Sequence, residues 1–178
     1  GGYTTYWFVG AGDTALTRRV FLRSTTTAAG VFGVGGADAL CQNTASGLGM
    51  GSNWQAIVSD SNVESFAVNR TNVNWGTLTN LDGATIATSW NDVWDGTIST
   101  GITISGAPVW TGSLSDGRAA TNTCNSWVTS SSAIWAHTGL SGNTATTWLS
   151  NNAPACNNSY YFYCIETGPN PADRLPNV

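Results

Sequence analysis

Short runs of apolar, aromatic and β-branched residues, each closed by glycine or a polar turn, recur along the chain and predict short β-strands. The predicted strands span residues 3–9, 19–24, 54–59, 108–112 and 160–165. The last run, Tyr-Tyr-Phe-Tyr-Cys-Ile, is aromatic or β-branched almost throughout. The residues between the second strand and Gly36 are Thr, Ala and Gly-rich and predict a loop, and Asp116-Gly117 predicts a turn.

Two segments instead follow the helical period. Small and apolar residues recur every three or four positions from Ala37 to Ala45, before Gly47 and Gly49, which predicts a helix. Ser89, followed by Trp90, Val93 and Trp94 and then by Gly96, predicts a second, N-capped helix. The pattern therefore predicts an α+β domain of many short strands, a few short helices and long loops.

The domain organisation follows from composition. We find no internal repeat and no interdomain linker, and the length suits one domain. After Thr167 the chain becomes proline-rich, which predicts an extended tail. We divide the chain into an N-terminal extension (1–18), a domain (19–167) and a C-terminal tail (168–178), and we expect any export signal to have been removed.

Charge is scarce, which excludes several classes of function. The chain has six Arg, no Lys and ten acidic residues, so only 9% of its residues are charged, against roughly 25% in ordinary soluble domains. Instead, 25 Thr, 18 Ser and 17 Asn supply the polar surface. Six scattered Arg cannot build a nucleic-acid footprint, and no apolar run approaches the ~20 residues of a spanning helix.

The four cysteines, Cys41, Cys124, Cys156 and Cys164, lack the C-x-x-C spacing of zinc or redox motifs. With a single histidine, His137, a zinc site is also poorly supplied. Two structural disulfides are the better interpretation, and they predict a location outside a reducing cytosol. The residues alone leave all three pairings of four cysteines open.

Several segments, read in order from the strand around Phe21, resemble the endostatin-like domains, closest to the bacterial branch that includes the leptospiral endostatin-like surface proteins. They are residues 35–41, 47–48, 54–59, 82–83, 90–96, 109–112 and 124–127, followed by Cys156 and residues 161–166. The resemblance implies a compact variant of the C-type lectin-like fold, with a twisted, mainly antiparallel sheet. It also implies two nested disulfides, Cys41–Cys164 and Cys124–Cys156. The heparin and zinc binding of vertebrate relatives does not transfer, since this chain lacks Lys and has no histidine before His137.

Two features match parts of a lectin or an enzyme site, and each has a simpler interpretation. Trp90-Asn91-Asp92 is the triplet that ligates calcium in sugar-binding C-type lectins, but it lies in a helix-period pattern and no partner motif occurs. His137, with Ser132 and Asp116, belongs to no nucleophile motif. Of the two glutamates, Glu64 and Glu166, the second fits a structural position of the family pattern. We therefore expect no catalytic, metal or cofactor site.

Nine tryptophans are the most unusual feature of the composition. Trp54, Trp90, Trp94, Trp110 and Trp127 lie in the family segments, and we expect them to be structural. Trp75, Trp135 and Trp148 lie in loop-like stretches beside Asn and Thr, which suits stacking on a sugar or packing on a protein. Tyr3, Tyr6 and Trp7 of the N-terminal extension are further predicted contact residues, because a β-prone end can add a strand to a neighbouring copy.

These observations support three hypotheses. The first is a secreted or cell-surface, non-enzymatic binding or adhesion module for a protein, an uncharged glycan or copies of itself. The second is a structural subunit of an extracellular filament, sheath or layer, a homopolymer joined through its terminal extensions. The third, which we consider weakest, is a calcium-dependent lectin or a hydrolase. Two sequons place possible glycosylation at Asn69 and Asn157.

Overall fold

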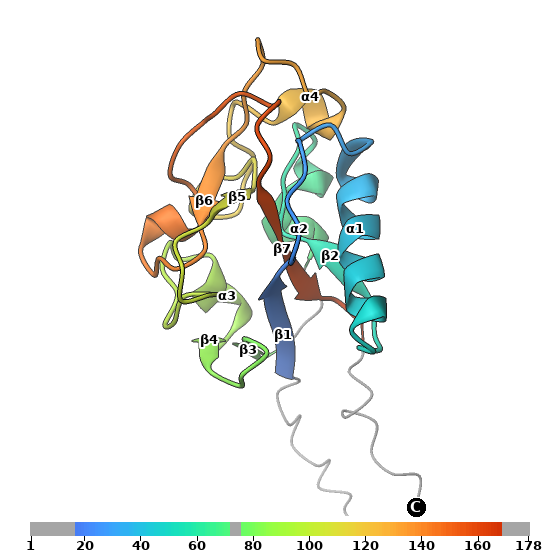
Figure 1. Ribbon diagram of the computed structural model, residues 1–178. Coiled ribbons are helices and arrows are strands. Elements are labelled where there is room, and N and C mark those ends of the chain that lie inside the picture. The colour runs from blue at the N-terminus through green and yellow to red at the C-terminus, as the bar shows by residue number, and fades with distance from the viewer. Residues whose placement is uncertain (1–16, 72–75, 169–178) are drawn as a thin grey trace, which may run out of the picture.

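Seven short strands form a single curled, mixed sheet in the computed structural model, which describes residues 17–71 and 76–168 (Figure 1). The strand order is β4-β3-β1-β7-β5-β6, with β2 also paired to β7. Their bounds are β1 Thr17–Leu22, β2 Trp54–Ala56, β3 Thr77–Thr79, β4 Thr85–Ala87, β5 Pro108–Trp110, β6 Thr138–Leu140 and β7 Tyr161–Glu166. The pairs β1–β3 and β5–β7 are parallel and the other four pairs are antiparallel, so the sheet is mixed and, as expected, mainly antiparallel.

Strand β7 is the centre of the sheet, and its sequence explains why. It pairs with β1, β2 and β5, and successive residues point to opposite faces, so both faces must be apolar. Tyr163 and Ile165 belong to one buried cluster, with Leu78 and Trp148. Phe162 and Cys164 belong to the other. The unbroken aromatic run therefore predicted a strand that the structure buries on both sides.

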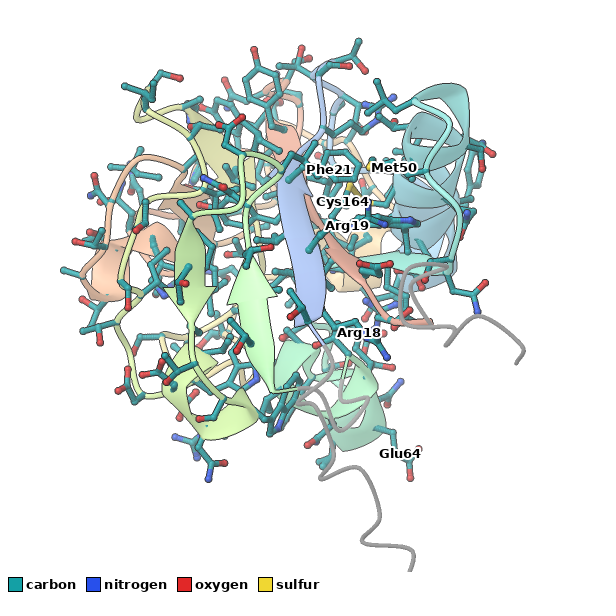
Figure 2. The ribbon with its side chains drawn as sticks, turned by 90° about the horizontal axis from the view of Figure 1, so that it is seen from below. Arg18, Arg19, Phe21, Met50, Glu64 and Cys164 are labelled. Carbon is teal, nitrogen blue, oxygen red and sulfur yellow. A yellow bond between two sulfur atoms is a disulfide. The ribbon has the colours of Figure 1, made fainter. Side chains whose placement is uncertain are left out.

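Helix α1 (Gly33–Gly47) covers one face of the sheet and α3 (Trp90–Val93) lies on the other side (Figure 1). The buried positions of α1 are spaced by four residues: Ala37, Cys41 and Ala45. Viewed from the end where β1 begins, Phe21, Cys164 and Met50 lie between β1 and α1 (Figure 2). The predicted helix at 37–45 is confirmed. It begins earlier than predicted, since residues 33–36, which we assigned to a loop, form its first turn.

The polar side of α1 protects an edge of the sheet. Asp38 Oδ1 accepts a hydrogen bond from the Ala56 N–H at 2.9 Å, and Gln42 Oε1 accepts one from the Trp54 N–H at 2.9 Å. Arg70 completes this contact, since its guanidinium pairs with Asp38 and donates to the Ala56 carbonyl at 2.7 Å. The side chains of Asp38 and Gln42 thus accept hydrogen bonds from the outward N–H groups of β2, which would otherwise be open to pairing with another strand.

The remaining helical elements are single turns: η1 (Val63–Ser65), α2 (Ala67–Arg70), α4 (Cys124–Trp127) and η2 (Thr146–Trp148). The predicted N-cap is confirmed, because the Ser89 hydroxyl accepts a hydrogen bond from the Asp92 N–H at 3.2 Å. The predicted turn at Asp116-Gly117 is also present, with the Gly117 N–H donating to the Leu114 carbonyl.

Both disulfides that the family resemblance implied are present. Cys41 on α1 is bonded to Cys164 on β7, and Cys124 on α4 is bonded to Cys156 in the loop before β7. All four sulfurs lie in the apolar cluster on the α1 side of the sheet. The first bond therefore fastens the long helix to the central strand, and the second fastens two loops at the far end of the molecule (Figure 1).

The chain enters and leaves the sheet at one end. Arg19 near the start of β1 hydrogen-bonds Glu166 at the end of β7, and Gly168 donates to the Asn53 carbonyl. Thr17 and Arg18, which we assigned to the N-terminal extension, already belong to β1. The strand predicted at residues 3–9 lies outside the described residues. Within the described residues, no helix combines the length and apolar character needed to cross a bilayer.

Candidate functional site: a polar hollow beside Trp135

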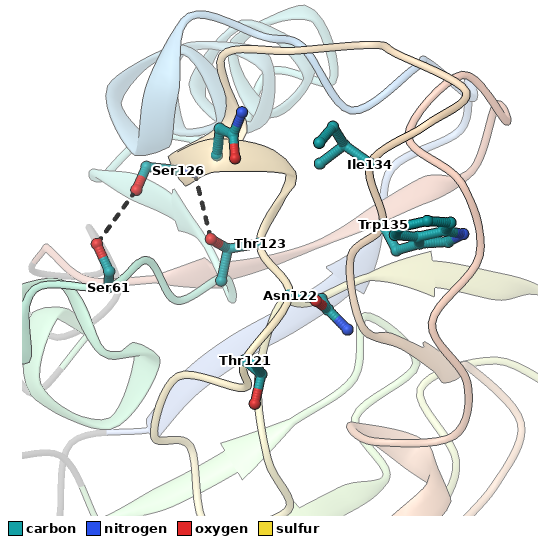
Figure 3. A pocket seen from close by; sticks show the side chains of 8 residues that line it. Ser61, Thr121, Asn122, Thr123, Ser126, Ile134 and Trp135 are labelled. Carbon is teal, nitrogen blue, oxygen red and sulfur yellow. Dashed lines mark hydrogen bonds between the residues drawn. The ribbon is translucent and has the colours of Figure 1, made fainter.

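A hollow of about 400 Å³ opens at the end of the molecule where α4 lies (Figure 3). One wall carries Trp135 and Ile134, and α4 supplies the side facing them. Its lining is uncharged and consists of two amides, four hydroxyls, one aliphatic side chain and one indole: Asn122, Asn125, Ser61, Thr121, Thr123, Ser126, Ile134 and Trp135. The hollow therefore offers hydrogen bonds and an aromatic face without a formal charge.

Trp135 is half exposed, at 50%, although its backbone is held on both sides. Its carbonyl accepts a hydrogen bond from the Cys124 N–H at 3.0 Å, and the residue forms a β-bridge to Ala155. The flanking Ala136 is buried and donates its N–H to the Pro154 carbonyl at 3.2 Å. A large apolar ring is thus presented to solvent from a fixed backbone, which lowers the entropy lost when a partner packs on it.

The facing wall is a left-handed turn. Cys124, Asn125, Ser126 and Trp127 have φ values of 52°, 51°, 57° and 66°. For L-residues this region costs roughly 1–2 kcal/mol per residue, and mainly glycine and, less readily, Asn or Asp adopt it. Four consecutive non-glycine residues there are strained, and such strain persists only where the surroundings enforce it.

Contacts around Trp127 enforce the turn. The indole is fully buried, packs edge-on against Trp110 and Phe162, and donates its Nε1–H to the Ser59 carbonyl at 2.9 Å. The Trp127 carbonyl accepts a hydrogen bond from the Val31 N–H at 2.9 Å. Gly112, at φ +54°, leaves the space that this indole occupies. The Cys124–Cys156 disulfide fixes the other end of the turn.

The hydroxyls of the lining are partly used in hydrogen bonds within the protein, whereas its two side-chain amides are not. Thr123 Oγ1 accepts a hydrogen bond from the Ser126 N–H at 3.2 Å, and the Ser126 hydroxyl lies 3.5 Å from that of Ser61. In the part of the chain that the structure describes, no hydrogen bond uses the Asn122 or Asn125 side-chain amides. Two amides that can each donate and accept therefore belong to the same lining as an exposed indole.

Other hollows lack this combination. One of about 450 Å³ includes the carboxylate of Asp82 and the exposed Ile104, without an aromatic ring: Asn80, Asp82, Thr100, Gly101, Ile102, Thr103, Ile104 and Gly142. A groove of about 340 Å³ beside α1 is mainly apolar: Thr27, Gly30, Val31, Phe32, Gly36, Ala39 and Leu40. Neither joins several unused amides to a fixed aromatic face, so the hollow at Trp135 is the better candidate.

The structure places the predicted contact residues in different environments. Trp135 lines the hollow, as a contact residue should. Trp148 does not reach the surface, because it is 1% exposed and packs against Trp94 and Tyr163, so its assignment as a contact residue is corrected to a core residue. Its position at the end of η2 turns the ring inward, where the Tyr163 hydroxyl donates to the Trp148 carbonyl at 2.7 Å. Trp75, Tyr3, Tyr6 and Trp7 lie outside the described residues.

The five tryptophans of the family segments are structural, as expected. Trp54, Trp94, Trp110 and Trp127 are buried, and Trp90 packs partly buried against the core. The Trp90-Asn91-Asp92 triplet forms the predicted capped helix, and Asp92 Oδ2 accepts hydrogen bonds from the N–H and hydroxyl of Thr88. No group of three metal-ligating side chains gathers among the described residues.

His137 is not joined to the partners that a catalytic triad would need. Asp116 Oδ2 pairs with Arg118 Nε at 2.6 Å, and Ser132 is exposed. Partial burial without a compensating charge lowers the pKa of His137, which favours the neutral imidazole. Glu166 is fully buried in an ion pair with Arg19, and Glu64 lies exposed in η1. Among the described residues, His137, Asp116 and Ser132 are therefore not joined by hydrogen bonds into a triad.

The two sequons differ in their surroundings. Asn157 is exposed in the turn that follows Cys156. Asn69 lies in α2, where its Nδ2 donates to the Val63 carbonyl at 2.6 Å, and Thr71 is fully buried. Both asparagines are exposed, and they differ in that the Asn69 side chain and the buried Thr71 take part in the packing around α2.

Sequence reasoning missed most of the hollow. Asn125 and Ser126 lie in the segment 124–127, which carries the family resemblance, and no sequence pattern singles out Asn122 or Ile134. The one available signal was Asn next to a cysteine, since Asn is the non-glycine residue that best tolerates positive φ. No protein-family model matches the chain, and no curated protein is similar to it at a significant level.

Proposed function

We propose that the protein is an extracellular, non-enzymatic binding module that recognises an uncharged glycan in the hollow beside Trp135. The observation that carries this proposal is the pairing of a half-exposed indole on a fixed backbone with an uncharged lining of amides and hydroxyls. Pyranose rings have an apolar C–H face and a rim of hydroxyls. The first suits packing on an aromatic face, and the second suits side chains that both donate and accept hydrogen bonds.

Charge supports a neutral ligand. In the described chain, no Arg lines the hollow, so a sulfated or phosphorylated ligand would lose its solvation there without gaining an ion pair. No carboxylate lines it either, so calcium would have no ligand of the kind that it prefers. Direct stacking and hydrogen bonding are the remaining means of holding a sugar.

The extracellular location is supported by the two disulfides, which persist in oxidising compartments. We also propose that the fold is an endostatin-like variant of the C-type lectin-like fold. Its support is the α+β architecture together with the two cysteine pairs that the family resemblance implied.

A glycan array with neutral, sialylated and sulfated oligosaccharides tests the function, followed by titration calorimetry on the best neutral binder. We expect Trp135→Ala to weaken binding at least about tenfold, which corresponds to about 1.4 kcal/mol. Val128→Ala is the matched control, because Val128 is exposed nearby but does not line the hollow. The proposal fails if no neutral glycan binds at millimolar concentration, or if Trp135→Ala binds as tightly as the wild type.

A further inference from the structure

We infer that the Cys124–Cys156 disulfide is the positioning element of the binding hollow, whereas Cys41–Cys164 serves the stability of the domain. This assignment rests on the proposed glycan binding, and it makes ligand affinity depend on the oxidation of one particular cysteine pair. The two bonds differ in what they join: Cys124–Cys156 joins the two walls of the hollow, and Cys41–Cys164 joins α1 to β7.

The first step is the conformation of the turn. Cys124 is the first of the four left-handed residues, and Asn125 and Ser126, which line the hollow, follow it directly. The Cys124 carbonyl accepts a hydrogen bond from the Val128 N–H at 3.3 Å, which closes the turn around these two residues. A change of Cys124 into the right-handed region would reorient the backbone that carries both lining side chains.

The second step is the partner of Cys124. The Cys156 N–H donates to the Ile134 carbonyl at 2.8 Å, and the preceding Ala155 is bridged to Trp135. Cys156 is therefore attached to the wall that carries Ile134 and Trp135. Its bond to Cys124 connects that wall covalently to the wall that carries Asn125, in addition to the hydrogen bond from the Cys124 N–H to the Trp135 carbonyl.

The other disulfide has no such role. Cys41 lies on α1 and Cys164 on β7, where it opposes Phe21 and Ala56 in the sheet. Neither cysteine is next in sequence to a residue that lines the hollow, whereas Cys124 lies between Thr123 and Asn125. Removal of this bond should lower stability through the lost cross-link and leave the binding geometry in place, which makes it the matched control.

The test compares Cys124→Ala/Cys156→Ala with Cys41→Ala/Cys164→Ala in calorimetric titrations with N-acetylchitotriose, maltotriose and the best neutral glycan from the array. Measurements are made below the midpoint of thermal unfolding of each variant. We expect the first variant to lose at least about tenfold in affinity and the second less than about threefold. Replacing Cys124 by Gly instead of Ala, in the Cys156→Ala background, should recover part of the loss, since glycine adopts positive φ without penalty.

A readout without ligand keeps the inference testable by itself. Backbone Cα and Hα chemical shifts of Asn125 and Ser126 report the left-handed conformation, and we expect it to disappear in Cys124→Ala/Cys156→Ala only. Unchanged shifts, or an affinity equal to that of the wild type, would overturn the inference while leaving the proposed function intact. If the wild type binds no neutral glycan, the proposed function fails, and the shifts still decide whether the disulfide holds the turn. If the alanine variant does not fold, the Cys124→Gly/Cys156→Ala variant decides it. We expect its shifts to lie between those of the wild type and averaged values, in line with its partial recovery of affinity, and unchanged shifts would overturn the inference.

Discussion

Glu166, at the end of the central strand, is fully buried and receives both hydrogen bonds of a bidentate ion pair from Arg19. The distances are 2.9 Å from Nε to Oε2 and 3.0 Å from Nη2 to Oε1, and the Arg19 N–H also donates to Oε2 at 3.2 Å. The arginine side chain is 26% exposed and lies over the Trp54 ring. The two partners therefore depend on each other unequally, because only the arginine retains contact with water.

We expect Arg19→Ala to destabilise the protein more than Glu166→Gln. The alanine variant leaves a buried carboxylate without its counter-charge, at a cost of about 3–5 kcal/mol. The glutamine variant leaves an arginine that water can still solvate, at a cost of about 1–3 kcal/mol. Urea unfolding of the three proteins measures the difference, and equal losses would contradict the asymmetry that the exposures imply.

Gly112 should tolerate no side chain. A Cβ there would lie 2.6 Å from Trp127 Cζ2 and 2.9 Å from the Ser59 carbonyl oxygen, at a φ of +54°. We expect Gly112→Ala to cost about 2–4 kcal/mol through overpacking and backbone strain. Gly106→Ala is the control, since a Cβ there meets nothing within 4 Å. A thermal midpoint for Gly112→Ala equal to that of Gly106→Ala would refute the packing around the indole.

The sequence predicts the same contact role for Trp148 and Trp135, but their different burial predicts different effects on stability. Trp148→Ala removes a buried ring that packs against Trp94 and Tyr163, and we expect a loss of about 3–5 kcal/mol. Trp135→Ala removes a half-exposed ring and should change stability by only about 0.5 kcal/mol. Chemical denaturation monitored by far-ultraviolet circular dichroism separates the two, and comparable losses would rule out this assignment of core and surface.

His137 should make the protein less stable in mild acid. Its folded pKa is lowered by burial, so as the pH falls through about 6.5 the unfolded chain takes up the proton first. Stability is therefore fully present above that pH and decreases as the pH approaches the lower folded pKa. We expect the thermal midpoint of the wild type to fall more between pH 7.5 and 5.5 than that of His137→Gln. Parallel curves would show that His137 does not titrate in this way.

Much of the fold could be predicted from local sequence. The run at 160–165 is apolar at every position, so only a central strand buries it, and β7 spans Tyr161–Glu166. The four-residue spacing of Ala37, Cys41 and Ala45 likewise fits only a helix with one buried face. By contrast, β3, β4 and β6 have three residues each, too few for a period to be recognised, and long-range hydrogen bonds define them.

The candidate site was only partly predictable. Trp135 stood out as an aromatic residue in a polar stretch, but so did Trp148, and nothing local distinguishes a ring that turns inward from one that turns outward. The left-handed turn at Cys124–Trp127 is stabilised by Ser59, Val31 and Cys156, which are remote in sequence. Its conformation therefore depends on contacts that no window of sequence contains.

The sequence by itself determined the chemical character of this protein: almost no charge, many amides and hydroxyls, an even set of cysteines and an aromatic central strand. These properties are additive over residues, so composition and period reveal them. The tertiary structure alone decided where that character becomes a site, because it brings residues 61, 121–123, 125–126 and 134–135 around one hollow. Such convergence arises from packing, strand pairing and a disulfide acting together, and these forces act between distant parts of the chain.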